Sequence, residues 1–171
     1  VLLPHGTFEI PEMPDFTKVQ RQRVIMTFGK FGTYKKVEVL IEAFRQLQDE
    51  GVKDIGLCIA GTDSPNNPGY LDRVKQQYSD VENIEFTGYV PEEDVARICS
   101  ESCMVVFPYS STTGSSGVLH QAGSYAKPVI LPDVGDLGRL IREEGYLGEF
   151  FAPDDAVQLA TAINRLLTDV P

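Results

Sequence analysis

Two kinds of apolar pattern alternate along the chain from about Val24, and this alternation limits the fold more than any other feature of the sequence. Short apolar runs predict buried strands, and longer stretches with apolar residues every three or four positions predict helices packed by one face. The expected strands cover residues 24–28, 55–60, 84–86, 104–107 and 128–131. The expected helices cover residues 35–50 and 70–78, a segment from Pro91, residues 116–125, and a last segment from Asp154. Repeated strand–helix units with short connections predict an α/β fold, a Rossmann-like doubly wound parallel sheet with helices on both faces.

Residues at the expected helix ends support this reading. Gly51 is placed to stop the first helix, and Pro91 followed by acidic residues is typical of a helix start. Asp154 is expected to cap the last helix. The face of that helix expected to point inward carries Ala156, Val157, Ala160, Ile163 and Leu167.

Length and charge narrow the classes of function. A chain of 171 residues is long enough for one domain with a substantial core, here residues 21–171. Residues 1–20 are proline-rich and irregular, so we expect a connecting segment packed on that domain. The formal net charge of −10 argues against a general nucleic-acid or anionic-membrane surface, because both need an excess of Lys and Arg. The sequence shows no secretion signal and no run of membrane-spanning length, so we expect a cytoplasmic protein.

The three cysteines, Cys58, Cys99 and Cys103, do not have metal-ligand spacing. Cys99 and Cys103 would share a helix face if the helix from Pro91 continued that far. We interpret all three as buried thiols in a reducing compartment, because an odd number without a framework does not suggest disulfides.

Ligands of parallel α/β sheets bind beyond the carboxyl ends of the strands, so the loops that follow the strands are the candidate site. These loops are residues 29–34, 61–69, 88–91 and 109–116. The last one continues into a run of hydroxyl and glycine residues that ends at Gly123. Free N–H groups of Ser116, Gly117 and Val118 in the first helical turn would suit a phosphate, and Gly114 would let it approach the backbone. A flexible Ser/Gly turn is the alternative.

The loop after the first strand adds positive charge. Lys30 is expected just after the strand and Lys35 at the start of a helix, where a cation opposes the helix dipole. An anion bound there would offset that cost, so the pair suits a diphosphate; solvated lysines on an exposed turn are the alternative. The loop is not a Walker motif.

Three more positions complete the set of candidates. Gln121 lies one helical turn beyond Gly117, and its amide would suit sugar hydroxyls, with a solvated glutamine as the alternative. Tyr89 and Val90 follow Gly88 and would cover a nucleotide base, with core packing as the alternative. We interpret His120 as a structural or interface residue.

In this order the loops resemble the C-terminal domain of a family 4 (group 1) glycosyltransferase with the two-domain GT-B fold. The resemblance runs from about Pro4 to Leu167. It is carried by Pro4-His5-Gly6, Phe28-Gly29-Lys30, Lys35 to Phe44, Ile59-Ala60-Gly61, Phe86-Thr87-Gly88-Tyr89-Val90-Pro91 and Ala126-Lys127-Pro128-Val129-Ile130.

The resemblance implies a retaining glycosyltransferase in which this domain binds a nucleotide-sugar donor, a UDP-sugar rather than a GDP-sugar. Lys30 and Lys35 stand at the positions that contact the diphosphate. The residues implied around the rest of the donor are Gly29, Gly61, Tyr89, Val90, Thr113, Gly114, Ser115, Ser116, Gly117, Val118 and Gln121. The family has two signature glutamates, and Thr113 and Gln121 stand in their places, facing the transferred sugar and the ribose. Lys36 replaces a usual glycine.

Such enzymes generally need no metal or other cofactor, and none is expected here. The acceptor would be a glycan or glycolipid in polysaccharide biosynthesis, bound by an N-terminal domain outside these 171 residues. Any contact with a membrane would be made through that domain. Two alternatives are a non-catalytic nucleotide-sugar binding module and a GT-B-fold epimerase acting on a UDP-sugar.

Overall fold

The computed structural model describes residues 23–111, 117–144 and 148–169. The strands are β1 (Arg23–Phe31), β2 (Ile55–Asp63), β3 (Ile84–Gly88), β4 (Ser102–Val106), β5 (Val129–Pro132) and β6 (Gly148–Phe151). The helices are α1 (Glu38–Asp49), α2 (Tyr70–Gln77), α3 (Glu92–Glu101), α4 (Gly117–Ser124), α5 (Gly135–Glu144) and α6 (Ala156–Asp169). The expected connecting segment, residues 1–20, lies outside the described residues.

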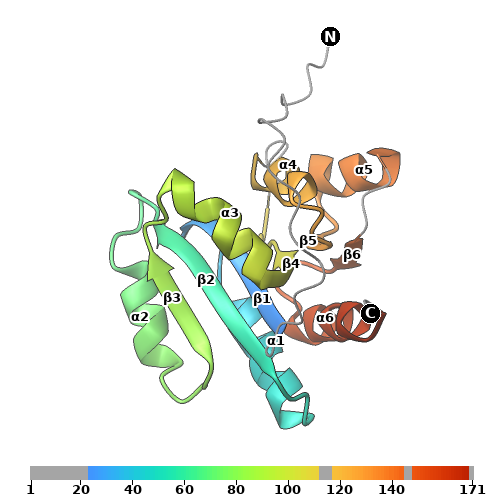
Figure 1. The fold of residues 1–171 in the computed structure, drawn as a ribbon. Helices are drawn as coiled ribbons and strands as arrows, with labels where there is room; N and C mark the ends of the chain where they lie inside the picture. Colours follow the sequence, from blue (N-terminus) through green and yellow to red (C-terminus); the bar gives the residue numbers. More distant parts are fainter. Residues whose placement is uncertain (1–22, 112–116, 145–147, 170–171) are drawn as a thin grey trace.

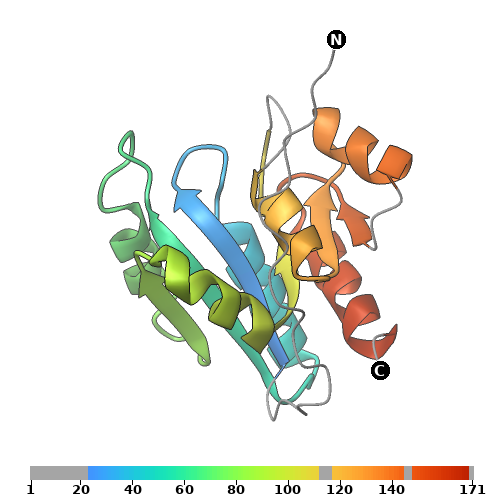
Figure 2. The same ribbon diagram turned by 45° about the horizontal axis from the view of Figure 1, so that its top comes forward.

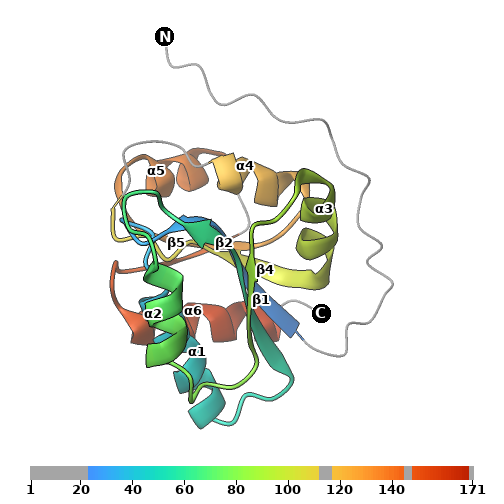
Figure 3. The same ribbon diagram turned by 90° about the vertical axis from the view of Figure 1, so that its left-hand side faces the viewer.

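The strands form one parallel sheet in the order β3-β2-β1-β4-β5-β6. Helices α1, α2 and α6 cover one face, and α3, α4 and α5 cover the other (Figures 1 and 3). The doubly wound α/β fold predicted from the alternating pattern is therefore confirmed. The order changes direction between β1 and β4, so the chain leaves these two neighbouring strands towards helices on opposite faces of the sheet, α1 and α4 (Figure 2).

The sheet is buried on both faces, which explains its continuous apolar strands. One core packs α1, α2 and α6 against side chains such as Ile25, Leu57 and Ile130. The other core packs α3 and α4 against Met26, Val105 and other residues of the opposite face. Alternate residues of one strand thus enter different cores, which holds the sheet rigidly below its carboxyl edge.

Two helix ends follow the sequence signals. Gly51 has a φ of +84°, its N–H donates to the Gln48 carbonyl at 2.9 Å, and the Val52 N–H donates to the Leu47 carbonyl at 3.0 Å. This is the glycine stop expected after α1. Pro91 directly precedes α3, as expected.

Two expectations for α6 are wrong. The cap of α6 is Asp155, whose carboxylate accepts from the Gln158 N–H at 2.9 Å, rather than Asp154. The sequence predicts an inward Val157, but its side chain is 61% exposed, because α6 buries Leu159, Ala160 and Ile163 instead. Helix α3 ends at Glu101, so Cys103 lies in β4 and does not share a helix face with Cys99. The pattern also did not predict α5 or β6.

Candidate functional site

Each of the first three strands carries a glycine near the carboxyl edge, where the three backbones lie side by side. Gly29 and Gly61 lie opposite each other in β1 and β2, and Gly88 pairs with Gly61 from β3. A Cβ atom on Gly61 would lie only 1.9 Å from the Gly29 carbonyl oxygen, and the φ of Gly61 is +135°. Only glycine fits this position, because any side chain would run into the backbone of β1.

Lys35 does not begin a helix, contrary to the sequence prediction. Helix α1 starts at Glu38, and Lys35 forms an antiparallel bridge with Tyr109. The Lys36 N–H donates to the Pro108 carbonyl at 3.0 Å, and the Ser110 N–H donates to the Tyr34 carbonyl at 2.8 Å. These bonds compete with a longer helix and join the loop after β1 to the loop after β4.

The Lys35 ammonium lies at this junction. A Cβ atom on Gly29 would lie 3.2 Å from the Lys35 Nζ, so the missing side chain makes room for it. The Nζ is 4.8 Å from the centroid of the Tyr109 ring and 5.8 Å from that of Tyr34. Burial lowers the pKa of Lys35, an effect that the neighbouring Tyr34 opposes. Less water around a cation strengthens its attraction to a bound anion.

Lys30 lies inside β1, opposite Thr62, rather than just after the strand. The strand continues to Phe31, whose side chain is fully buried and holds the last residues in the sheet. Lys30 itself is exposed, one residue beyond Gly29. Both lysines of the predicted diphosphate site are therefore at the carboxyl edge, although neither has the local structure expected for it.

The hydroxyl and glycine loop is only partly described. Thr113, Gly114, Ser115 and Ser116 lie outside the described residues. Gly117 and Val118 begin α4, as predicted, and the first N–H groups of a helix have no partners within it. Gln121 is half-buried one turn further along, and His120 is buried, in agreement with a structural role.

The connection between β2 and α2 holds the loop after β1, which carries Lys35, in place. The sequence pattern did not predict this role for the connection. The Asp63 carboxylate accepts from the Gly69 and Leu71 N–H groups at 2.6 and 2.8 Å. The Asn67 amide donates to the Gly32 carbonyl at 2.7 Å, and the Ser64 N–H donates to the Phe31 carbonyl at 2.7 Å. An aspartate a few residues before a helix was the available signal.

Tyr70, the first residue of α2, also anchors the loop after β1. Its hydroxyl accepts from the Val37 N–H at 2.9 Å and donates to the Glu38 carboxylate. A Cβ atom on Gly32 would lie 2.7 Å from the Tyr70 ring, so glycine lets the loop cross directly over that ring. The start of α1 is thereby anchored close to Lys35 by a side chain of another helix.

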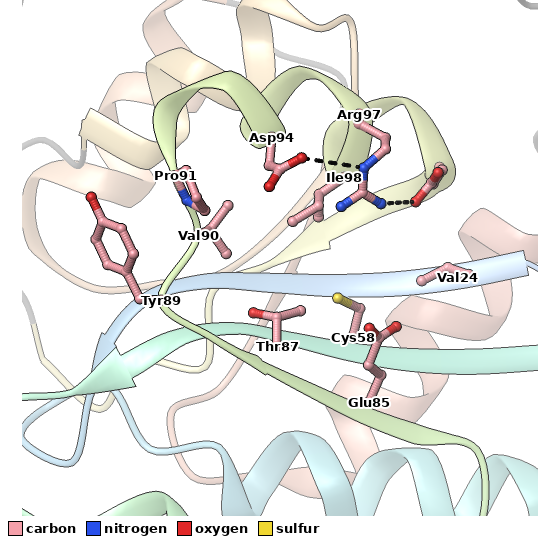
Figure 4. Close-up of a pocket in the computed structure, with 11 residues that line it drawn as sticks. Val24, Cys58, Glu85, Thr87, Tyr89, Val90, Pro91, Asp94, Arg97 and Ile98 are labelled. Atoms are coloured by element: carbon pink, nitrogen blue, oxygen red, sulfur yellow. Dashed lines mark hydrogen bonds and ion pairs between the residues drawn. The ribbon is translucent and has the colours of Figure 1, made fainter.

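Tyr89 and Val90 line a cavity of about 250 Å³ between α3 and the sheet (Figure 4). The Tyr89 side chain is 78% exposed and stands apart from the other lining residues. Further along the cavity, Arg97 forms ion pairs with Asp94 and Glu101 at 3.5 and 3.0 Å.

Cys58 also lines this cavity, and it is not suited to act as a nucleophile. Burial, with the neighbouring Glu85 and Glu101 carboxylates, raises its pKa to about 12. A thiol with that pKa is protonated at neutral pH, and the thiolate is the reactive form. The interpretation of Cys58 as a buried thiol is confirmed.

Lys127 belongs to a motif that carried the family resemblance, but its contacts are structural. Its ammonium donates to the Ser102 carbonyl at 2.6 Å and reaches the Ser100 carbonyl at 3.4 Å. These carbonyls lie at the end of α3, where a cation complements the helix dipole. Lys127 thus ties the start of β5 to the end of α3.

Among the described residues, no group of three or more His, Cys, Asp or Glu side chains is placed to hold a metal ion. In the same part of the chain, every helix is too short or too polar to cross a membrane. At the described part of this edge, Lys30, Lys35 and the start of α4 offer positive charge to a ligand.

Comparison with known proteins identifies the family of this chain. The sequence profile of the family described as glycosyl transferases group 1 matches residues 22–169. A GDP-mannose:glycolipid 4-beta-D-mannosyltransferase from Xanthomonas campestris is 33% identical over 135 residues, which cover 75% of this chain and 37% of that protein. The chain therefore spans little more than a third of the length of that relative.

Solved structures share the fold. The Anabaena protein HepE, crystallised with UDP and glucose, superposes with a TM-score of 0.76 at 20% identity, covering 87% of this chain and 39% of HepE. A sucrose-phosphate synthase from Thermosynechococcus elongatus gives a TM-score of 0.72 at 25% identity, covering 90% of this chain and 38% of the synthase. In each case the likeness is to a part of a longer protein.

Proposed function

Because this chain belongs to the group 1 family of glycosyl transferases, we propose that it binds the nucleotide-sugar donor for transfer of the sugar to a glycan or glycolipid. The observation that carries this proposal is the junction of the loops after β1 and β4. It holds the Lys35 ammonium over Gly29, at the edge where ligands of such sheets bind. The names of the mannosyltransferase and of the HepE complex support a nucleotide-sugar ligand.

In this proposal the diphosphate of the donor lies at the carboxyl edge of the sheet, near Gly29, Gly61 and Gly88. Lys30, Lys35 and the N–H groups of Gly117 and Val118 surround it and stabilise the negative charge that grows as the sugar leaves. No metal is needed in this scheme, because the lysines and the helix start supply the charge.

The remaining donor contacts are assigned from the positions that resemble the family motifs. Gln121 hydrogen-bonds the ribose hydroxyls, and Thr113 faces the transferred sugar. Tyr89 and Val90 lie near the base. A neutral amide at position 121 binds hydroxyls less strongly than the carboxylate usual in the family, by about 1 kcal/mol.

The base is uridine or guanosine. HepE was crystallised with UDP, whereas the Xanthomonas relative is named for GDP-mannose. Parallel titrations with UDP and GDP identify the base, because the diphosphate that binds more tightly shows which class of donor the protein uses. Either result leaves the diphosphate assignment intact.

Transfer requires a site for the acceptor, which we assign to a further domain of the same protein, on the N-terminal side. We also propose that the protein works in the cytoplasm, where nucleotide sugars are supplied, and that it meets a membrane through that other domain. With only this chain present, donor binding is expected with little or no sugar transfer.

Calorimetric titration with UDP and with GDP tests the proposal. Wild-type protein is expected to bind one of them, and a Lys30→Ala/Lys35→Ala variant to lose that binding. A Lys53→Ala/Lys75→Ala variant is the matched control, because it removes the same charge far from the edge. Equal binding by the Lys30/Lys35 variant would reject the diphosphate assignment.

The longer protein, assayed with donor and an acceptor extract, tests transfer itself. A sugar-bearing glycan or glycolipid product is expected. Donor hydrolysis alone, or no reaction, would contradict transfer and favour a binding module. An epimeric nucleotide sugar formed without acceptor would instead indicate an epimerase.

A further inference from the structure

The Tyr109 ring is held rigidly beneath the carboxyl edge. Its side chain is 2% exposed, although it follows β4 in a segment that leads to the surface. The rings of Tyr34 and Phe107 each contact it edge-on, with centroids 5.5 Å apart and interplanar angles of 89° and 83°. Such edge-to-face packing fixes the plane of a ring, so the face that Tyr109 presents to the edge is fixed as well.

That face lies beside the Lys35 ammonium. The distance of 4.8 Å from the Nζ to the ring centroid is within the range of about 6 Å over which a ring attracts a cation. The backbones of Lys35 and Tyr109 are bridged, so the two side chains start from paired positions. Gly29, which has no side chain, leaves space for the Nζ.

We propose that Tyr109 is a positioning residue, whose ring holds the Lys35 ammonium at the carboxyl edge before a nucleotide arrives. This inference rests on the proposed function, because it takes a diphosphate as the ligand of Lys35. A lysine has a flexible four-carbon stem and normally loses much conformational freedom when it binds. Tyr109 removes that freedom in advance, so more of the attraction to phosphate appears as affinity.

Three variants test the proposal. Tyr109→Leu removes the ring, and Tyr109→Phe keeps it while removing only the hydroxyl. Tyr78→Leu is the matched control, because Tyr78 is also a buried ring beside a cation, 5.5 Å from the Arg45 guanidinium, and it lies at the end of α2. Each is titrated by calorimetry with UDP and GDP, and by ligand-observed NMR with uridine and guanosine.

Tyr109→Leu is expected to weaken binding of the nucleoside diphosphate about tenfold, with no change for the nucleoside. Tyr109→Phe and Tyr78→Leu are expected to bind both like the wild type. Equal diphosphate affinity in Tyr109→Leu, or equal losses for diphosphate and nucleoside, would overturn the positioning role. If the leucine variant does not fold, Tyr109→Met, which fills more of the space, takes its place with the same expectations.

The Lys35 side chain itself gives a second readout. Its Cε methylene protons are expected to be shifted upfield by the ring in the wild type, and absence of that shift would overturn the proposal. Wild-type protein that binds neither UDP nor GDP would instead reject the proposed function, whatever the variants do.

Discussion

Replacing Gly61 by alanine tests whether Gly61 packs as closely against the Gly29 backbone as the structure shows. The new Cβ would lie 1.9 Å from the Gly29 carbonyl oxygen, closer by about 1 Å than such atoms approach without a shift of the backbone. It would also stand at a φ of +135°, which side-chain-bearing residues rarely adopt. Both partners are backbone within paired strands, so neither can move aside cheaply.

The expected cost follows from these two effects. Overpacking costs about 1–3 kcal/mol, and a side chain in a backbone conformation suited only to glycine costs about 1–3 kcal/mol more. We therefore expect Gly61→Ala to lower the free energy of unfolding by about 4 kcal/mol. Gly51→Ala is the matched control: its φ is +84°, but the space around its Cβ is empty, so we expect about 1 kcal/mol.

Urea denaturation followed by circular dichroism measures both losses, with the m-value as a check that the unfolded state is unchanged. Calorimetry with UDP and GDP then shows whether the displaced Gly29 carries Lys35 with it, which would weaken binding in Gly61→Ala alone. If both variants lose the same stability, the close approach of Gly29 to Gly61 is not a real constraint and the reasoning fails.

Three further predictions test other parts of the account. Gly29→Ala should displace the Lys35 Nζ, which would lie 3.2 Å from the new Cβ, and weaken nucleotide binding more than Gly88→Ala, whose Cβ meets nothing within 4 Å; equal affinities would contradict this. Folding raises the pKa of Cys58 from 9.0 to about 12, so between these pH values the thiol is ionised in the unfolded chain and protonated in the folded one. The free energy of unfolding therefore falls by about 1.4 kcal/mol per pH unit as the pH rises from 9 to 12. Cys58→Ala should show a shallower alkaline loss in urea titrations, and an identical slope would refute the assignment. Lys127→Met should cost about 1–2 kcal/mol in urea denaturation by leaving the Ser102 carbonyl without its donor, yet leave nucleotide affinity unchanged.

The sequence predicted the sheet well because long apolar segments with clear periods report burial directly. Each strand expected from Val24 onward is present, and the Gly51 and Pro91 signals lie at helix ends. Strand β6 and helix α5 were missed for a physical reason. The β6 sequence is only four residues long, and α5 begins at Gly135 and contains a second glycine, Gly138.

At the site, the sequence predicted the residues better than their local structure. The sequence pattern of α1 predicts a helix start at Lys35, whereas the bridge to Tyr109 holds Lys35 outside the helix. That bridge depends on the tertiary register between two distant loops, which no local pattern reports. Asp155 replaced Asp154 as a cap for a similar reason, since adjacent aspartates give the same signal and the backbone decides between them.

The central claim is that a nucleoside diphosphate binds at the carboxyl edge, and an NMR map of backbone amide shifts tests it most directly. UDP and GDP would be added to the labelled chain, and the amides that move would be assigned. The account predicts that the largest shifts occur at Gly29, Lys35, Gly61 and Gly117. Shifts concentrated instead around residues 48–55 and 80–83, which line a separate cavity at the amino ends of β2 and β3, would contradict it.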